Sequence, residues 1–191
     1  LTRTWDLCCT DVMQGIVFGL YTEDLNSSKN HTRFDSDECF GTVINRFCLQ
    51  AILGEPLTVF GEGKHKRTFI SLNDSIQALM IAVKNKAQKG HVQVWNQLSE
   101  WHSMDDIANK VIEEASKLSI KVEKQYINTP RNEKTGEHYY NFITKKLDDF
   151  GYVPTRSIAE EIRYVITALN DKLNDNDKSV LRKVVIPKIK W

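Results

Sequence analysis

The chain has 191 residues, of which 41% are hydrophobic, and a formal net charge of +1 from 26 basic and 25 acidic side chains. This length and apolar content predict one folded core, as a single domain or part of a larger one, and argue against disorder. The balanced charge excludes whole-chain attraction to nucleic acid or to an acidic membrane surface, so any anion site must come from local placement of basic residues.

The four cysteines form no CxxC pair and no Cys/His metal spacing, so we expect reduced thiols, no metal site and a cytoplasmic location. No stretch approaches the roughly 18 to 20 apolar residues that span a bilayer, and no signal peptide is recognisable. The chain begins at Leu1, close to an apolar strand, which suggests a piece of a longer polypeptide whose functional residues are incomplete here.

Residues 5–19, "WDLCCTDVMQGIVFG", form an apolar run typical of a strand buried on both faces. The polar stretch that follows, "YTEDLNSSKNHTRFDSDE", is longer than most loops and predicts a functional lid or a mobile insertion. Residues 42–53 are predicted to be a helix that ends at Gly54.

Two short strands are predicted at 57–60 and 68–72, joined by a Gly-rich basic turn. The next helix is expected to be capped by Asn73 or Asp74 and to end at Gly90. Its apolar side chains fall at the spacing of a buried stripe: Ile76, Leu79, Met80 and Val83.

Beyond this helix, "HVQVWNQ" alternates as a strand does, and Ser103 opens a second helix with a capping-box-like "SMDD". We also expect a strand at 120–127, helices at 143–150 and 157–174, and a surface extension in the tail "KVVIPKIKW". Strands alternating with helices predict an α/β domain. No GxGxxG turn occurs, so the dinucleotide-phosphate fingerprint is missing.

Four basic residues stand in a row in the turn, Lys64 to Arg67. They are either a solvated hairpin tip or an anion clamp in which the planar guanidinium of Arg67 holds a phosphate. Arg131, in the loop "NTPRNEKTGEHYYN", is either a surface arginine or a second donor to the same anion. Two arginines on separate loops would suit a diphosphate.

The strand residues Leu57, Thr58 and Val59 either pack in the core or offer backbone groups to a planar base such as uracil. Gln14 is either an amide bonded to the backbone or a group that faces a cofactor ring at the end of its strand. The residues alone leave both pairs of alternatives open.

The cluster of His138, Tyr139 and Tyr140 is either amphipathic packing or the wall of a pocket for sugar hydroxyls. No GxSxG, HExxH or YxxxK motif and no catalytic triad is found in the chain. The main proton-transfer group is therefore expected elsewhere, and no catalytic residue is assigned in this chain.

The order of "MQGIVFG", the long polar stretch, "FGTVINRFCLQAILGEPLTVFGEG", "RTFISLNDSIQALMIAV" and "PRNEKTGEHYYN" resembles the C-terminal half of extended short-chain dehydrogenases that act on nucleotide sugars, the NAD-dependent epimerase/dehydratase family. Within it, "VWNQLSEWHSMDDIA" and "EHYYN" are similar to the UDP-sulfoquinovose synthase group. The resemblance runs over nearly the whole chain. It implies that residues 1–40 are the end of a Rossmann sheet with an active-site lid, and 41–191 a UDP-sugar-binding domain.

The resemblance also implies roles for individual residues. Gln14 and Val17 match positions beside NAD, and Arg67 and Arg131 match arginines that grip the diphosphate. The remaining matches are substrate positions: Gly41, Thr42 and Val43 at a helix start, where amides favour an anion, Leu57, Thr58 and Val59 around the uracil, and His138 and Tyr139 on the far wall.

The reaction that the resemblance implies begins with oxidation of the UDP-glucose C4 hydroxyl by NAD. Loss of water, addition of sulfite and return of the hydride follow. The tyrosine and lysine of YxxxK would lie before Leu1, so we expect that this chain alone is inactive and needs the N-terminal half of the same protein, commonly as a homodimer.

Three features depart from the group: Met13 replaces an Asn, the turn "GEGKHKR" is more basic, and the polar stretch diverges. A UDP-glucose 4-epimerase or a sugar 4,6-dehydratase therefore stays open, as does a nucleotide-sugar binding module without redox chemistry.

Overall fold

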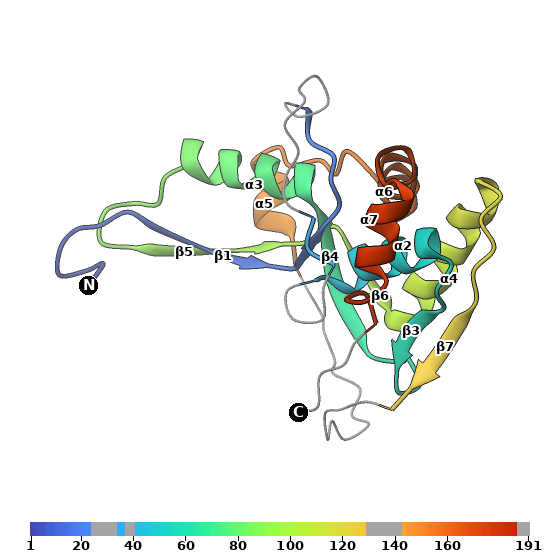
Figure 1. Ribbon diagram of the computed structural model, residues 1–191. Coiled ribbons are helices and arrows are strands. Elements are labelled where there is room, and N and C mark those ends of the chain that lie inside the picture. The colour runs from blue at the N-terminus through green and yellow to red at the C-terminus, as the bar shows by residue number, and fades with distance from the viewer. Residues whose placement is uncertain (24–33, 37–40, 129–142, 187–191) are drawn as a thin grey trace.

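The computed structural model describes residues 1–23, 34–36, 41–128 and 143–186. Strands and helices alternate along these residues, as predicted for an α/β domain (Figure 1). The strands are β1 (Cys9–Gln14), β2 (Ile16–Phe18), β3 (Leu57–Phe60), β4 (Lys66–Ser71), β5 (Val92–Gln97), β6 (Glu100–Ser103) and β7 (Lys124–Ile127). The helices are α2 (Val43–Leu53), α3 (Leu72–Lys84), α4 (Met104–Lys117), α5 (Lys145–Asp149), α6 (Ile158–Lys172) and α7 (Asp175–Leu181).

Three parallel strand pairs organise the described chain: β1 with β5, β2 with β4, and β3 with β7. The only antiparallel pair among the described residues joins β4 to β6. The predicted hairpin is therefore wrong, because β3 and β4 each pair with other strands and the basic turn between them links two different sheets. Strand β6 was not predicted.

The apolar run at 5–19 is divided at Gly15 into β1 and β2. Gly15 donates its N–H to the carbonyl of Gln97 at 2.8 Å. A Cβ at this position would lie 3.1 Å from the backbone oxygen of Thr68, so glycine permits the close approach of β4. Burial on both faces is wrong for β1, where Met13 is 56% exposed.

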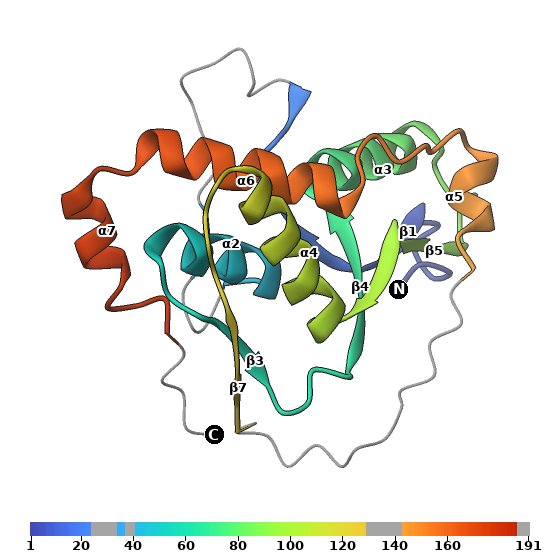
Figure 2. The same ribbon diagram turned by 90° about the vertical axis from the view of Figure 1, so that its right-hand side faces the viewer.

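The main core lies where α2, α4 and α6 pack against one another and over β2, β3 and β4 (Figure 2). The helices present apolar stripes to this core and begin at side-chain caps where the sequence provides them. Ser103 and Ser157 each form a capping box, with Asp106 and Glu160 respectively. The core side chains that are fully buried include Ile44, Phe47, Leu57, Val59, Phe69, Ile107, Val111, Ile162, Val165 and Ile166.

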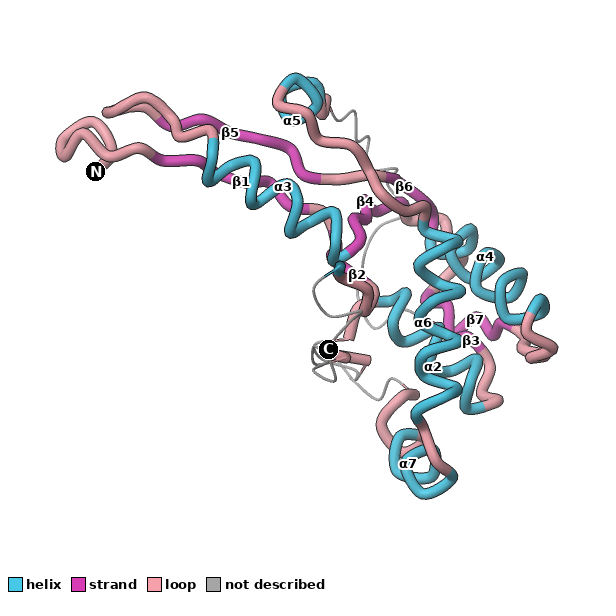
Figure 3. The backbone as a smooth tube through the Cα atoms, turned by 90° about the horizontal axis from the view of Figure 1, so that it is seen from above, coloured by secondary structure: helices cyan, strands magenta, loops and turns pink. Residues whose placement is uncertain are grey.

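A second region, which we call the arm, consists of β1, β5 and α3 and extends away from the main core (Figure 3). A smaller apolar cluster beside the arm combines Ala78 of α3 and Trp95 of β5 with Ile70, Leu147 and Tyr152 from outside the arm. The predicted buried stripe of α3 is wrong, since its four side chains are 41% to 66% exposed. The helix instead turns Asp74, Ser75 and Ala78 inward.

Several predicted ends also differ. The cap of α3 is Ser71, which accepts the N–H of Asp74, and the helix ends at Lys84 rather than at Gly90. The strand predicted at 120–127 begins only at Lys124.

The tail is not a simple surface extension. Helix α7, which was not predicted, begins at an Asn174 capping box, and beyond it Val185 is 1% exposed against Leu49 and Leu53 of α2. Arg182 donates twice to the carbonyl of Leu53, at 2.9 and 3.2 Å. This segment therefore closes the C-terminal end of α2.

Candidate functional site

A polar cluster stands at the C-terminal ends of the parallel strands β1 and β5. The Gln14 amide donates to Ser75 Oγ at 2.7 Å and to Gln97 Oε1 at 2.9 Å, and the Gln97 amide donates to the Ser75 carbonyl at 2.7 Å. Gln97 is fully buried, whereas Gln14 is exposed. Ligands of α/β sheets bind outside the carboxyl ends of the strands, so this edge is the first place to expect one.

The alternative in which the Gln14 amide bonds to the backbone is wrong. Its N–H groups are held by neighbouring side chains rather than by backbone, and its exposed position leaves room for a ligand beside it. Val17, in contrast, packs against the apolar cluster beside the arm. The predicted contacts of both residues with NAD stay predictions.

Side chains from α2 and α6 accept hydrogen bonds from the backbone of the turn after β2. Gly19 donates its N–H to Asn45 Oδ1 at 3.1 Å, and Leu20 and Tyr21 donate theirs to Glu161 Oε1 at 2.9 and 3.0 Å. Gly19 has φ +97°, and a Cβ there would collide with the Glu161 carboxylate. Only glycine allows this approach, so the turn is locked where the polar stretch begins.

Glu161 is itself fully buried and paired. Its other oxygen lies 3.3 Å from Arg156 Nη1, and the Arg156 guanidinium carbon is 3.6 Å from the centroid of the Tyr21 ring. Sequence reasoning missed this residue. The signal was a carboxylate within the apolar stripe of α6, between Ile158 and Ile162.

Thr58, at the centre of the predicted uracil segment, has each of its polar groups bonded to α2. Its N–H donates to Gln50 Oε1 at 3.1 Å, its hydroxyl accepts from Gln50 Nε2 at 2.8 Å, and its carbonyl accepts from Arg46 Nη2 at 3.2 Å. Leu57 and Val59 are fully buried and Thr58 is 3% exposed. Contact of this strand with a base therefore requires the chain around β3 to open, and the uracil contact stays a prediction.

The basic turn separates into exposed and inward parts. Lys64 is exposed and bonded to Glu62 at 2.6 Å, and Lys66 is exposed with its ammonium 4.3 Å from the Trp101 ring centroid. His65 is half-buried, and its carbonyl accepts the N–H of Met104.

Arg67 is half-buried and lies opposite His102 in the β4–β6 pair, so both side chains are on one face of the pair. Its Nη1 donates to the neighbouring Lys66 carbonyl at 3.0 Å. No ion pair of Arg67 is present among the described residues. The grip of its guanidinium on a diphosphate stays a prediction.

Gly41, Thr42 and Val43 lead into α2 as expected. Thr42 is the N-cap residue, with φ −71° and ψ 151°, but its side chain makes no capping hydrogen bond. Arg131, His138 and Tyr139 lie outside the described residues. Whether Arg67 and Arg131 lie close enough to hold one diphosphate therefore stays a prediction.

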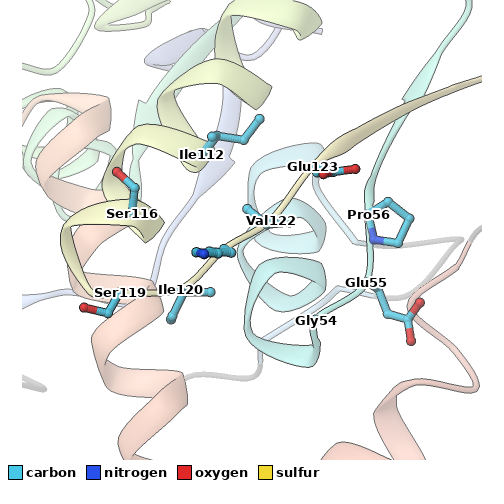
Figure 4. A pocket seen from close by; sticks show the side chains of 10 residues that line it. Gly54, Glu55, Pro56, Ile112, Ser116, Ser119, Ile120, Val122 and Glu123 are labelled. Atoms are coloured by element: carbon cyan, nitrogen blue, oxygen red, sulfur yellow. The ribbon is translucent and has the colours of Figure 1, made fainter.

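A hollow of about 820 Å³ lies elsewhere, between the end of α4 and the strands β3 and β7 (Figure 4). It is lined by Gly54, Glu55, Pro56, Ile112, Ser116, Ser119, Ile120, Lys121, Val122 and Glu123. None of these is a predicted site residue. The hollow is next to the starts of β3 and β7, which is the end of a parallel pair opposite to the usual ligand edge.

Two negative findings concern the part of the chain that the structure describes. Its His, Cys, Asp and Glu side chains form no group of three or more that could hold a metal ion. No helix in those residues has the length and apolar character that crossing a membrane requires.

Comparison with known proteins gives one family. The model described as "NAD dependent epimerase/dehydratase family" matches residues 19–96. The UDP-sulfoquinovose synthase of Sulfolobus acidocaldarius is 41% identical over 187 residues, which cover 98% of this chain and 47% of that protein. Residues 19–96 of this chain are thus similar to the NAD dependent epimerase/dehydratase family.

Further comparisons extend the likeness. The chloroplastic UDP-sulfoquinovose synthase of Spinacia oleracea is 34% identical over 193 residues, covering 99% of this chain and 38% of that protein. The chain thus spans less than half the length of these two relatives. The fold is shared with the UDP-glucose 4-epimerase of Thermus thermophilus, solved with NAD, at a TM-score of 0.65 and 18% identity over 87% of this chain and 48% of that one.

Proposed function

We propose that this chain is the substrate-binding portion of an NAD-dependent nucleotide-sugar enzyme, with UDP-sulfoquinovose synthesis as its first candidate reaction. The observation that carries the proposal is the 41% and 34% identity to two UDP-sulfoquinovose synthases over almost the whole chain. The substrates would be UDP-glucose and sulfite.

The polar edge at the ends of β1 and β5 would hold the cofactor. Gln14 and Val17 would lie beside NAD at the carboxyl ends of β1 and β2, the edge where α/β sheets bind such ligands. NAD, when bound, would supply reversible hydride transfer at the sugar C4 carbon. Gln97 and Ser75 hold the Gln14 side chain in place for that contact.

The substrate would lie between the start of α2 and the end of the basic turn. The uncapped N-terminus of α2, at Gly41 to Val43, favours a negative ligand, and Arg67 offers a half-buried guanidinium. Leu57 to Val59 would bracket the uracil after the chain around β3 opens. Arg131, His138 and Tyr139 would complete the pocket.

The arm would pack against a partner. The edge of β1 and the apolar side chains of α3 are exposed, and the chain covers 47% and 38% of its two relatives. Both observations support an N-terminal half of the same protein that extends the sheet and supplies the catalytic tyrosine and lysine. The division at residue 40 and the homodimer belong to the same proposal.

The first test is calorimetry with UDP-glucose and with NAD on the 191-residue chain and on the intact protein. Binding of UDP-glucose with little binding of NAD to the chain supports a substrate-binding portion. If the intact protein binds neither ligand, the proposal is wrong.

Arg67→Ala in the intact protein should weaken UDP-glucose binding, with the exposed Lys64→Ala as the matched control. Unchanged affinity in the Arg67 variant would remove its assignment to the diphosphate. Omission of sulfite separates the candidate reactions, because product formation that does not depend on sulfite favours an epimerase or a 4,6-dehydratase.

A further inference from the structure

Arg46, which the reasoning on sequence did not single out, is a buried cation. The residue is 7% exposed, and its guanidinium carbon lies 5.4 Å from the ring centroids of both Phe47 and Phe60. Nη2 donates to the Thr58 carbonyl at 3.2 Å, whereas Nε is buried and has no hydrogen-bond partner. One donor of a nearly enclosed guanidinium is therefore unused.

The charge of Arg46 is also unbalanced. No ion pair in the described part of the chain includes it. Burial lowers the pKa of Arg46 to about 10, so the side chain is still charged at neutral pH. Buried charges are normally paired, because removing an ion from water is costly without a countercharge. Packing alone would favour an apolar side chain at this position.

A second buried polar group without a hydrogen-bond partner lies one turn earlier, at the N-cap of the same helix. Thr42 Oγ1 is buried without a partner, and the first turn of α2 contains no acidic residue to balance the positive end of the helix. Thr42 and Arg46 are four residues apart and therefore share one face of α2. Two unused donors and an uncompensated helix end thus occur together.

Arg46 further joins two segments that the proposed function assigns to the nucleotide. Its N–H donates to the Thr42 carbonyl at 2.9 Å within the start of α2, and its side chain bonds to Thr58 in β3. Its side chain therefore links β3 to the first turn of α2.

We propose that Arg46 is a binding residue of the UDP-sugar site: its charge is balanced by the diphosphate of the bound nucleotide, and its side chain links β3 to the start of α2. This inference rests on the proposed function. It assigns to Arg46 a role in the affinity for the phosphates rather than for the base.

The test compares Arg46→Gln, Arg46→Lys and the control Gln50→Leu in the intact protein. Gln50 is a matched control because it bonds Thr58 from the same helix face without a charge. Calorimetry measures UDP-glucose, and competition measures uridine, which has the base but no phosphate. Thermal unfolding of each variant reports its stability.

Arg46→Gln should weaken UDP-glucose binding by about tenfold or more, because a charged donor to the phosphates is lost. Uridine binding should change by less than about threefold, and Arg46→Lys should restore most of the UDP-glucose affinity since the charge is kept. Gln50→Leu should alter the two ligands by the same factor. The melting temperature of Arg46→Gln should change little, since removal of an unpaired buried charge offsets the loss of the bond to Thr58.

Three results would overturn the inference while leaving the proposed function intact: unchanged UDP-glucose binding by Arg46→Gln, equal losses for uridine and UDP-glucose, or equal losses in the Gln and Lys variants. If the wild-type protein binds no UDP-glucose, the proposed function is wrong and the inference is overturned with it.

Discussion

The main core and the arm contain helices with similar apolar spacing but very different burial. In α4, Ile107 and Val111 are fully buried between α2 and α6. In α3, Leu79 and Val83 are at the same four-residue spacing but are 44% and 66% exposed. Periodicity therefore shows which face of a helix is apolar, and the tertiary arrangement decides whether anything covers it.

The two regions also differ in what fixes them. The main core contains buried polar side chains that bond to backbone groups from other elements, as Glu161 does to the turn after β2 and Gln50 does to β3. The arm has such contacts too, from Gln97 to the Ser75 carbonyl and from the Thr155 N–H to Asp74, but the apolar cluster beside it is the smaller one. We therefore expect stability to reside mainly in the core.

The largest effect should come from Phe47→Ala in α2. Phe47 is fully buried in the main core, and truncation of such a side chain costs about 3–5 kcal/mol through lost apolar burial and the cavity that remains. Urea denaturation measures the free energy of unfolding. A loss below about 1.5 kcal/mol would mean that the core packs less tightly than its burial indicates.

A smaller loss is expected for Glu161→Gln. The amide keeps an acceptor for Leu20 and Tyr21 but loses the charge that pairs with the half-buried Arg156, so the free energy of unfolding should fall by about 1–3 kcal/mol. The exposed Glu160→Gln is the control, since it retains a capping acceptor. Equal effects of the two substitutions would show that the buried carboxylate does not fasten the turn.

Asp105→Asn tests a pair at the edge of the core. Hydrogen bonds from Lys124 and Tyr126 lower the pKa of Asp105, and the Lys124 contact is 2.6 Å long. A lowered pKa in the folded state adds stability that is present above the ordinary value of 3.8 and is lost as the pH falls through the folded value.

The substitution should therefore cost about 0.5–1 kcal/mol at pH 7 and nothing after the carboxylate is protonated. Urea denaturation at a series of pH values from neutral to strongly acidic measures the difference. A difference that is independent of pH would show that Asp105 acts through packing rather than through its charge.

Local patterns in the sequence predicted the elements but not their partners. Helix α2 and its stop at Gly54 were correct, because an apolar helix followed by glycine is a local signal. The pairing of β3 with β7 and of β4 with β2 was missed, because it joins residues about 50 to 70 positions apart. Ser71 displaced the predicted caps of α3 because β4 runs directly into the helix.

For the candidate site, the sequence likewise indicated some of the residues but not the partners that they contact. The resemblance drew attention to Gln14 and Arg67, which lie at strand ends as expected. It did not identify Arg46, Gln50 or Glu161, whose partners become visible only when α2 and α6 are placed against β3 and the turn after β2. Polar residues inside the apolar sequence "VINRFCLQAIL" were the available signal.

The smallest effect is expected for Met80→Ala in the arm. Met80 is 51% exposed, so its truncation should change the free energy of unfolding of the 191-residue chain by less than about 0.5 kcal/mol. In the intact protein the same substitution should cost about 2 kcal/mol or more, if an N-terminal half covers α3. Denaturation of both proteins measures the contrast, and Met104→Ala in the core provides the reference for a methionine that is already packed. Equal small losses in both proteins would show that the apolar face of α3 remains uncovered, and would remove one of the two observations that support a partner for the arm.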